Sequence, residues 1–323
     1  MILVYHRIAD CTWNPFNTCV APKNFEEHLT VLRKFGSPAT AKAIAQAGIA
    51  ARQSATRIAV TFDDGYRDNV DVARPILEAH DFPATIFICN NAVLRRIPYY
   101  WDEATSILDE QATPPNTSVA CGNRHWDMHG DLTVRQKVYV EFCSTLNHST
   151  VAARNDAIVS LRQVAVTREE EANLLLTVDE IVALGADRLL TLGAHTLDHA
   201  WLPNESAEAQ LYQLQQSRLE LEEVVGRPIV EVAYPYGRFD STTSAAAKLA
   251  GYAFAYTTVR HRVRPGVHPM EIPRIVVPNV DGDGFEYFLR EMVFGLGGRG
   301  GLQWAVNRCI RKARLRLEAQ AAF

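Results

Sequence analysis

Short apolar runs alternate with longer amphipathic stretches along most of this chain. Residues 2–5, 58–62 and 84–89 are mostly apolar, which is typical of strands buried on both faces. Apolar residues at helical spacing from Asn24 to Phe35 predict a helix between the first two strands. Further strands are expected at 189–192, 229–234, 253–257 and 272–277, and further helices at 69–80, 177–184, 206–225 and 241–250. This alternation predicts an α/β fold built on a parallel sheet.

Residues 91 to about 180 interrupt the alternation. Thr113-Pro114-Pro115-Asn116 marks a loop, and polar, mostly helical patterns follow from Thr133 to Leu176. Because flanking strands tie both ends and no flexible linker intervenes, we expect a helical insertion over the barrel at about 93–180, not an independent domain. We therefore expect one barrel domain over 1–285, insertion included, and a C-terminal helical extension over 286–323.

The expected extension begins with a glycine-rich run at 295–301, which resembles a hinge. A helix is expected over residues 302–317, with an apolar face and a polar face crowded with arginine and lysine. Such a helix fits contact with an anionic membrane surface. Packing on the barrel, or pairing of two copies in a homo-oligomer, is the alternative.

Composition and charge narrow the class of protein. With 323 residues, 47% hydrophobic and 22% charged, the chain has the composition of a globular protein with a large core. A formal net charge of -4 argues against a nucleic-acid partner. No apolar stretch reaches the roughly 18 residues that span a bilayer. Residues 1–7 resemble a first strand and not a secretory leader, so a cytoplasmic location is expected.

The cysteines form neither close metal-type pairs nor a dense framework. We therefore expect reduced, mostly buried thiols. A bridge between Cys11 and Cys19 is the one local alternative. The six positions are Cys11, Cys19, Cys89, Cys121, Cys143 and Cys309.

Two short runs carry the candidate chemistry. Asp63 and Asp64 directly follow one expected strand, and His195 follows another, with His199 four residues further on. The carboxyl ends of parallel barrel strands share one rim, so we expect these side chains to converge. Histidines at this spacing would share one face of a helical turn and bind one ion. Asp64 and the two histidines would then leave coordination positions open, and Asp63 would accept a proton from a water whose pKa the ion lowers.

Each run alone has an ordinary explanation. An Asp-Asp-Gly sequence is often a solvated turn. An isolated His-x-x-x-His is more often a pair of surface or helix-packing histidines. Their joint position at strand ends of one parallel α/β chain favours the metal site.

Three motifs in order make the chain resemble the polysaccharide deacetylase family, the NodB-homology carbohydrate esterases of the family 4 type. The first, Thr-Phe-Asp-Asp-Gly, stands at 61–65, and the second, His-Ser/Thr-x-x-His, stands at 195–199. The third, Tyr-Pro-Tyr-Gly, stands at 234–237. The opening at residues 4–7, Val-Tyr-His-Arg, is similar to a branch of the family found in sugar and exopolysaccharide pathways. The resemblance covers roughly residues 1–280.

The resemblance implies a distorted (β/α) barrel that removes an N-linked, less often O-linked, acyl group from a sugar. The group is typically acetyl, removed by attack of a metal-bound water with Asp63 as the base. Asp64, His195 and His199 would be the ligands of one divalent ion, zinc in the first place, with cobalt, nickel or iron as alternatives. Tyr236 would help to form the oxyanion hole through its backbone N–H, a contribution of roughly 3–4 kcal/mol. An ordinary strand-ending turn is the alternative for residues 234–237.

The chain departs from the family pattern at the residue that orients the base. Better-known members carry an arginine two residues before the proline of the third motif, where this chain has Ala233. Arg274 is the candidate to orient Asp63 instead, and we count it among the candidate substrate-binding residues. A surface or structural arginine is the alternative.

The general acid is the second departure. The family's late Leu-x-x-His pattern is absent, and His261 and His268 lie in a polar loop. His6, at the end of the first strand, is the better candidate to protonate the leaving amine. A histidine that only bonds the barrel's backbone is the alternative.

Aromatic residues near the insertion are candidates for a sugar pocket. Trp101 and Asp102, with Tyr66, Tyr99 and Tyr100, would line it, because aromatic faces stack on sugar rings. Core packing under the insertion is the alternative. A cleft restricted by the insertion would favour a small or activated sugar, such as a nucleotide- or lipid-linked precursor, over a long polymer.

Two other functions stay open. The same site would serve a hydrolase of a non-sugar amide, and the same fold would serve a non-catalytic carbohydrate-binding homologue. Asp63 argues against the second, because a base beside an intact metal triad has no role in recognition alone.

Overall fold

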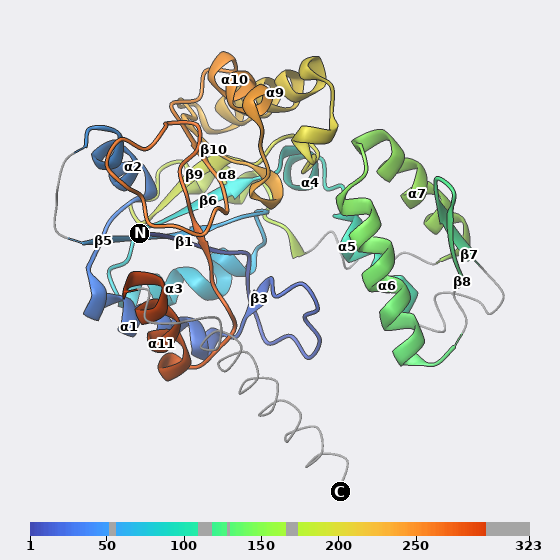
Figure 1. Ribbon diagram of the computed structural model, residues 1–323, viewed down its shortest axis with the longest axis horizontal. Helices are drawn as coiled ribbons and strands as arrows, with labels where there is room; N and C mark the ends of the chain where they lie inside the picture. The colour runs from blue at the N-terminus through green and yellow to red at the C-terminus, as the bar shows by residue number, and fades with distance from the viewer. Residues whose placement is uncertain (52–55, 109–117, 128–129, 166–173, 295–323) are drawn as a thin grey trace, which may run out of the picture.

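The main body is a parallel sheet that curls into a distorted barrel. It is seen in a computed structural model that describes residues 1–51, 56–108, 118–127, 130–165 and 174–294 (Figure 1). The strand order is β11-β10-β9-β6-β5-β1-β12, every pairing is parallel, and β4 pairs with β5 at its side. The strands are β1 (Ile2–Tyr5), β4 (Ser37–Pro38), β5 (Arg57–Phe62), β6 (Ala84–Ile88), β9 (Leu190–Ala194), β10 (Glu231–Ala233), β11 (Phe254–Tyr256) and β12 (Ile275–Val276). The predicted α/β barrel is confirmed.

An irregular segment at 269–276 joins the two edges of the curled sheet. Ile272 N–H donates to the carbonyl of Ala255 in β11 at 2.9 Å. Three residues later, Ile275 pairs with Leu3 of β1 in parallel register. The barrel is therefore closed by hydrogen bonds of a bent segment and not by two full-length neighbouring strands, which explains its distortion.

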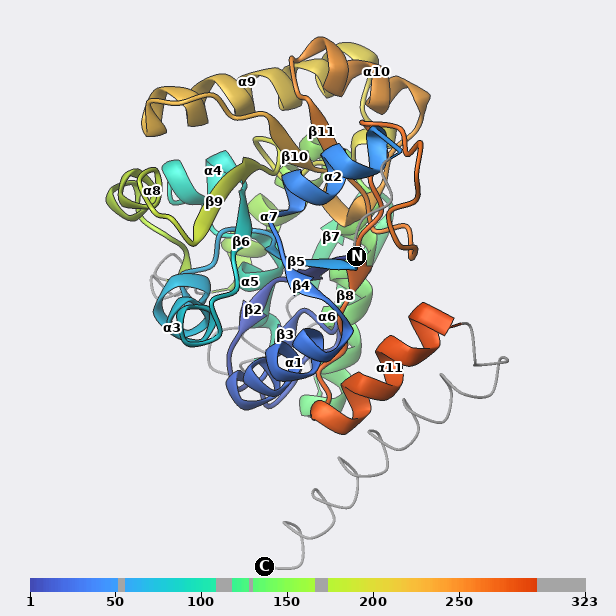
Figure 2. The same ribbon diagram turned by 90° about the vertical axis from the view of Figure 1, so that its left-hand side faces the viewer.

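Helices cover the outer face of the barrel (Figure 2). Alternate strand positions such as Leu3 and Val60 pack with the outer helices in the largest apolar cluster. The positions between them, Ile2 and Ala59, pack in a separate cluster with α2. Both faces of the strands are thus buried, which accounts for their continuous apolar sequences. The helices of the main body are α1 (Pro22–Phe35), α2 (Ala41–Ile49), α3 (Arg74–Ala79), α4 (Asn90–Leu94), α8 (Val178–Leu184), α9 (Ala207–Val225), α10 (Ser241–Leu249) and α11 (Gly282–Phe294).

Several helix boundaries follow from local chemistry. Thr177 and Glu180 form a reciprocal capping box at the start of α8, where the sequence predicts a helix start. The first helix begins at Pro22, before the expected Asn24, because proline suits the first helical position. The expected helix at 69–80 divides into a π-helical turn (Asn69–Ala73) and α3. None of the described helices is long and apolar enough to cross a bilayer.

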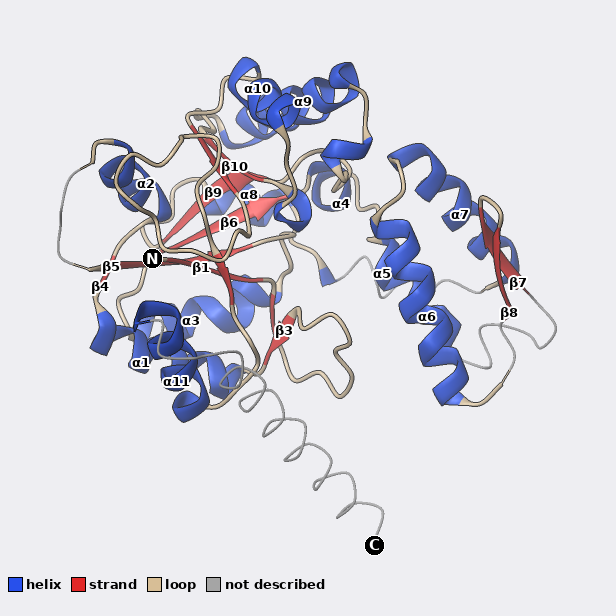
Figure 3. Ribbon diagram, in the orientation of Figure 1, coloured by secondary structure: helices blue, strands red, loops and turns tan. Residues whose placement is uncertain are grey.

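The insertion lies beside the barrel and has an apolar cluster of its own (Figure 3). Trp126, Phe142 and Leu161 are among its buried residues. Its elements are α5 (Tyr100–Glu103), a 3₁₀ turn (Ala104–Leu108), β7 (Ser118–Cys121), β8 (Arg124–Asp127), α6 (Leu132–Asn147) and α7 (Val151–Val164). The antiparallel hairpin β7–β8 was not expected from the sequence. Its strands are short, and a four-residue strand gives little period-2 signal.

A disulfide corrects the expectation of reduced thiols. Cys11 and Cys19 are bonded, and they close the loop between β2 (Arg7–Ile8) and β3 (Cys19–Val20). Cys89, Cys121 and Cys143 are free and buried, as expected.

The C-terminal segment of the described chain packs back on the first helix. Phe285 of α11 stacks on His28 of α1 with ring centroids 3.8 Å apart. The expected helix at 302–317, the glycine-rich run before it and Cys309 lie outside the described residues.

Candidate active site

The two predicted runs meet at the carboxyl ends of β5 and β9. Asp64 Oδ1 lies 3.5 Å from His195 Nε2 and 3.3 Å from His199 Nε2. One ligand atom from each of the three residues lies within 4.8 Å of the others. All three side chains are buried. The convergence expected from the strand positions is therefore present.

The loop that carries His195 and His199 has a different backbone conformation from the expected helical turn. His195 and His199 do not lie on a helical turn, since Thr196 and His199 have φ values of 66° and 52°. Two left-handed residues fold the loop tightly and turn both imidazoles towards Asp64. Gln213 of α9 fixes this loop, because its Oε1 accepts hydrogen bonds from the backbone N–H of Leu197 and Asp198.

A backbone carbonyl sets the tautomer of His195. His195 Nδ1 lies 2.8 Å from the carbonyl oxygen of Ala233 and donates to it. The Nε2 lone pair is therefore free to face Asp64. Burial lowers the pKa of His195 to about 4 even though Asp63 is near, so the imidazole is neutral at physiological pH.

The donor set fits a divalent cation. Burial opposes ionisation of Asp64, but the adjacent His199 and the other imidazoles lower its pKa to about 2. Its Oδ1 is buried and makes no hydrogen bond within the described residues. A buried carboxylate oxygen without a donor needs a positive partner. One carboxylate with two imidazoles is a common ligand set for zinc and similar ions.

Arg274 binds the carboxylate of Asp63 through both oxygens. Its two terminal nitrogens lie 2.7 Å from Oδ1 and 2.7 Å from Oδ2 of Asp63. Nη1 also donates to Thr61 Oγ1 at 3.1 Å, and Nε donates to the carbonyl of Thr257 at 3.3 Å. Burial opposes ionisation of Asp63, but Arg274, followed by His195, holds its pKa below its usual range. The base candidate is thus ionised and fixed in orientation.

The expected contact of Arg274 with Asp63 is present, but a direct contact with substrate is not favoured. Arg274 has no exposed surface, and its hydrogen bonds go to protein atoms. It acts through Asp63.

His6 lies at the same rim, immediately after β1. Its backbone carbonyl accepts a hydrogen bond from Asn69 Nδ2 at 2.8 Å. His6 is among the groups whose electrostatic interaction lowers the pKa of both Asp63 and Asp64. His268, by contrast, is exposed and pairs with Glu271. The position of His6 agrees with the choice made from the sequence, and its role stays a prediction.

Two of the candidate sugar-pocket residues, Tyr66 and Asp102, form a buried support for a third, Trp101. Trp101 Nε1 donates to Tyr66 Oη at 2.7 Å, and Tyr66 donates to Asp102 Oδ2 at 2.9 Å. Tyr66 and Asp102 are buried, whereas Trp101 is half-buried. Trp101 stacks on Tyr99 at 4.3 Å and meets the ring of His199 edge-on at 4.9 Å. Tyr66 and Asp102 therefore hold Trp101, which is the member placed to meet a ligand.

Tyr236 stands on the other side of His199. Its ring lies 4.6 Å from that of His199, and its φ of 58° marks a tight turn after β10. Burial raises the pKa of its phenol to about 12, so the hydroxyl is neutral, and it lies 3.1 Å from the hydroxyl of Tyr100. The oxyanion role of its backbone N–H stays a prediction.

Comparison with known proteins identifies the family. The sequence profile described as "Polysaccharide deacetylase" matches residues 50–118 and 164–255. The chain belongs to the polysaccharide deacetylase family. Its activity class is therefore that of a carbohydrate deacetylase, a hydrolase. No curated protein matches the chain.

Solved structures show the same fold at low sequence identity. The deacetylase PplD from Streptococcus pyogenes, solved in complex with acetate, is 18% identical, with a TM-score of 0.53 over 90% of this chain and 96% of that one. IcaB from Ammonifex degensii is 18% identical, with a TM-score of 0.55 over 88% and 92%. The BpsB deacetylase domain from Bordetella bronchiseptica is 15% identical, with a TM-score of 0.51 over 85% and 94%.

The polysaccharide deacetylase profile leaves out residues 119–163, which hold most of the insertion. A residue in this unmatched segment contacts the site, and it was not expected from the sequence. Arg154 of α7 is buried and donates to the carbonyl of His199 at 3.1 Å and to that of Asp198 at 2.5 Å. Its guanidinium also lies over the ring of Tyr100. No sequence motif indicates Arg154, because its contacts with the two carbonyls depend only on where α7 packs.

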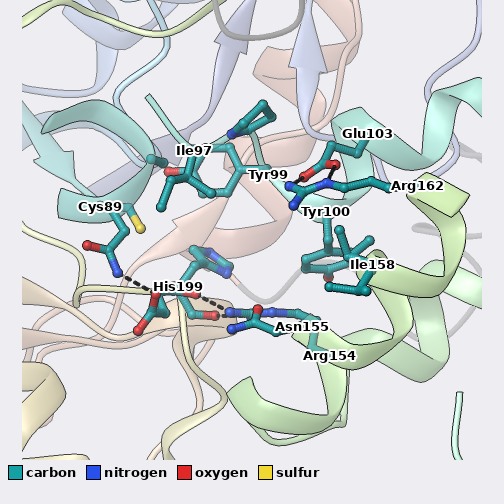
Figure 4. Close-up of a pocket in the computed structure, with 15 residues that line it drawn as sticks. Cys89, Ile97, Tyr99, Tyr100, Glu103, Arg154, Asn155, Ile158, Arg162 and His199 are labelled. Atoms are coloured by element: carbon teal, nitrogen blue, oxygen red, sulfur yellow. Dashed lines mark hydrogen bonds and ion pairs between the residues drawn. The ribbon is translucent and has the colours of Figure 1, made fainter. Parts of the chain in front are cut away.

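A pocket of about 280 Å³ lies between α7, α4 and α5, with His199 at one wall (Figure 4). A bidentate pair between Glu103 and Arg162, with both N–O distances 2.7 Å, joins α5 to α7 beside it. The apolar Ile97 and Ile158 line the same pocket. In this deacetylase the insertion therefore packs directly against the loop that carries a metal-ligand candidate.

Proposed function

We propose that this protein hydrolyses the N-acetyl groups of acetylated sugar units with the help of one divalent metal ion. The proposal rests on the different surroundings of two adjacent carboxylates, Asp63 and Asp64. Asp64 converges with His195 and His199, and Arg274 binds both carboxylate oxygens of the adjacent Asp63. The family membership supplies the substrate class, since its members are described as polysaccharide deacetylases.

Asp64, His195 and His199 would hold the ion. When bound, a divalent cation supplies Lewis acidity, which lowers the pKa of water and polarises a carbonyl oxygen. Zinc suits a site of one carboxylate and two imidazoles, and cobalt, nickel or iron have compatible preferences.

Asp63 would take the proton of the attacking water. Its ionised state and its fixed orientation by Arg274 support this role. The backbone N–H of Tyr236 would donate to the oxygen on which negative charge develops. The C–N bond then breaks, the acetyl group leaves as acetate, and the amine nitrogen takes a proton from His6.

The barrel and its insertion would work as one unit in this reaction. Arg154 and the pair of Glu103 with Arg162 fasten α7 to the rim of the barrel. We accordingly keep residues 1–285, insertion included, as one proposed domain.

The test combines metal content with acetate release. Elemental analysis should find about one ion per chain in the wild type, and the His195→Ala/His199→Ala variant should have lost it. The metal-loaded wild type should release acetate and a free amine from N-acetylated sugars in equal amounts.

Asp63→Asn separates the base from the ligands. We expect this variant to keep its metal and to lose about 10²–10⁴-fold in turnover. A variant that keeps full turnover refutes the base assignment. A wild type without metal, even after reconstitution, refutes the metal site and leaves a carbohydrate-binding protein as the explanation. Turnover of simple amides but not of acetylated sugars would assign the site to a non-sugar amide hydrolase.

A further inference from the structure

We propose that an aromatic surface formed by Trp13, Phe16 and Trp101 on a base of Tyr139 binds sugar units of a glycan chain next to the one that reacts. This inference rests on the proposed function, and it names the substrate as an oligomer or polymer of acetylated sugars. It replaces the sequence-based expectation of a small or activated sugar.

A series of contacts links the aromatic surface to the candidate metal site. The ring of Trp101 lies 4.9 Å from that of His199, a metal-ligand candidate. Tyr139 of α6 donates its hydroxyl to the carbonyl of Trp101 at 3.1 Å. The ring of Tyr139 then contacts Trp13 at 5.1 Å and Phe16 at 5.9 Å. Aromatic groups thus lead outward from the site to the loop between β2 and β3.

The outer members of the aromatic surface are accessible. Phe16 has 36% of its surface exposed, and Trp13 and Trp101 are half-buried. Tyr139 is buried beneath them at 6% exposure. In Figure 1 the loop that carries Trp13 and Phe16 extends from β3 towards α6. Two parts of the chain, one from the barrel and one from the insertion, therefore build one surface.

The loop is held in shape before any ligand arrives. The Cys11–Cys19 disulfide closes it at its base. Asn14 donates to the carbonyl of Cys19 at 2.9 Å and accepts from the backbone N–H of Thr18 at 3.0 Å. A surface loop that presents two aromatic rings in a fixed arrangement loses little entropy on binding.

The chemistry of the aromatic surface fits a glycan. Sugar rings present C–H faces that stack on aromatic rings, and the methyl groups of acetyl substituents add apolar area. Because the surface begins beside His199, a chain whose unit reacts at the metal site would continue across it. A single sugar would occupy the site without reaching Trp13 or Phe16.

The experiment compares substrates of different length. β-Linked N-acetylglucosamine oligomers of one to five units serve as probes, with acetate release as the readout. For the wild type we expect kcat/KM to rise with length. The ratio of kcat/KM between pentamer and monomer should fall about tenfold in Trp13→Ala/Phe16→Ala, from the loss of two stacking contacts. Tyr212→Ala, which removes an exposed aromatic ring from α9, should leave the ratio unchanged.

A second variant keeps the aromatic rings and releases the loop. Cys11→Ser/Cys19→Ser should lower the same ratio in the same direction. An unchanged pentamer-to-monomer ratio in Trp13→Ala/Phe16→Ala overturns the proposal.

A wild type that releases no acetate from any oligomer would count against the proposed function and not against the aromatic surface. Calorimetric titration of the wild type with the pentamer then decides. Pentamer binding that weakens about tenfold in Trp13→Ala/Phe16→Ala supports the surface, and equal binding to both proteins overturns it.

Discussion

Arg274 and Asp63 form a bidentate pair in the interior of the barrel, with both N–O distances 2.7 Å. The two residues are 211 positions apart in the sequence. Arg274 reaches Asp63 from the segment that leads into β12 and not from the third motif, where Ala233 stands two residues before the proline. The carbonyl of Ala233 has a different task, because it accepts the hydrogen bond that orients His195.

Arg274→Lys should separate charge from geometry. Lysine keeps a positive charge but cannot bind both carboxylate oxygens, so Asp63 should lose its fixed orientation. We expect kcat to fall about 10²-fold, as for other small misplacements of a reacting group. Arg274→Met should in addition destabilise the fold by about 3–5 kcal/mol, because it leaves a buried charge unpaired. Steady-state kinetics and urea unfolding measure the two effects.

The matched control for Arg274→Lys is Arg290→Lys. Arg290 pairs with Glu286 on the exposed side of α11. Its replacement by lysine should change the free energy of unfolding by less than about 0.5 kcal/mol. Wild-type turnover in Arg274→Lys would contradict the positioning role.

Arg154→Met should weaken metal binding. The side chain holds the backbone of Asp198 and His199, and groups that orient metal ligands typically contribute 10–100-fold to affinity. Titration of the metal-free protein with zinc against a competing chelator measures the affinity directly. Arg162→Gln on the same helix is the control, since Arg162 bonds only Glu103 among the contacts described above. It should lower the melting temperature and leave the zinc affinity unchanged. Equal zinc affinity in Arg154→Met and the wild type would refute the prediction.

His6→Ala should distinguish amide from activated ester substrates. An amine is a poor leaving group without a proton, so amide hydrolysis should slow about 10²–10⁴-fold. p-Nitrophenyl acetate has a leaving group that departs as an anion, so its hydrolysis needs no acid and should be nearly spared. Rates on the two substrates that fall by the same factor would show that His6 is not the general acid.

His28 should make the protein less stable in acid. Burial lowers the pKa of its imidazole from the usual 6.5 to about 4. Its Nε2 donates to the carbonyl of Val280 at 2.7 Å, and its Nδ1 accepts from Tyr5 at 3.3 Å, so the neutral form fills both hydrogen bonds. The unfolded chain takes up a proton below pH 6.5 and the folded chain does not, so stability falls between pH 6.5 and pH 4. The full loss is about 3 kcal/mol.

Urea unfolding at pH 7 and pH 4.5 measures this loss for the wild type and for His28→Gln. Glutamine can still donate to Val280 but does not titrate. The difference in unfolding free energy between the two pH values should therefore be smaller in His28→Gln. A difference of the same size in both proteins would assign the acid sensitivity to other groups.

The sequence predicted the parts of the site that depend on strand ends. Asp63, Asp64 and His195 each follow a strand, and parallel strands bring their carboxyl ends to one rim whatever the detailed packing. The contact of Arg274 with Asp63 was also expected, but from the family resemblance, since the arginine that the third motif usually carries is replaced here by Ala233.

The contacts that were missed depend on backbone details or on tertiary packing. The helical turn expected for His195 and His199 is wrong, because two left-handed residues, Thr196 and His199, fold the loop instead. Spacing alone does not distinguish these two ways of bringing i and i+4 together. Arg154 was missed because its contacts with backbone carbonyls leave no pattern in the sequence. Reduced thiols were expected at Cys11 and Cys19 because a single pair of cysteines gives a weak signal.

The distance along the chain between Asp63 and Arg274 has a consequence for biosynthesis. During translation the segment with Asp63 leaves the ribosome long before the segment that leads into β12. Until β12, the last strand among the described residues, docks beside β1, the carboxylate of Asp63 lacks its counter-charge. In the proposed reaction, Asp63 would therefore gain its orientation as the base only after nearly the whole barrel has been synthesised.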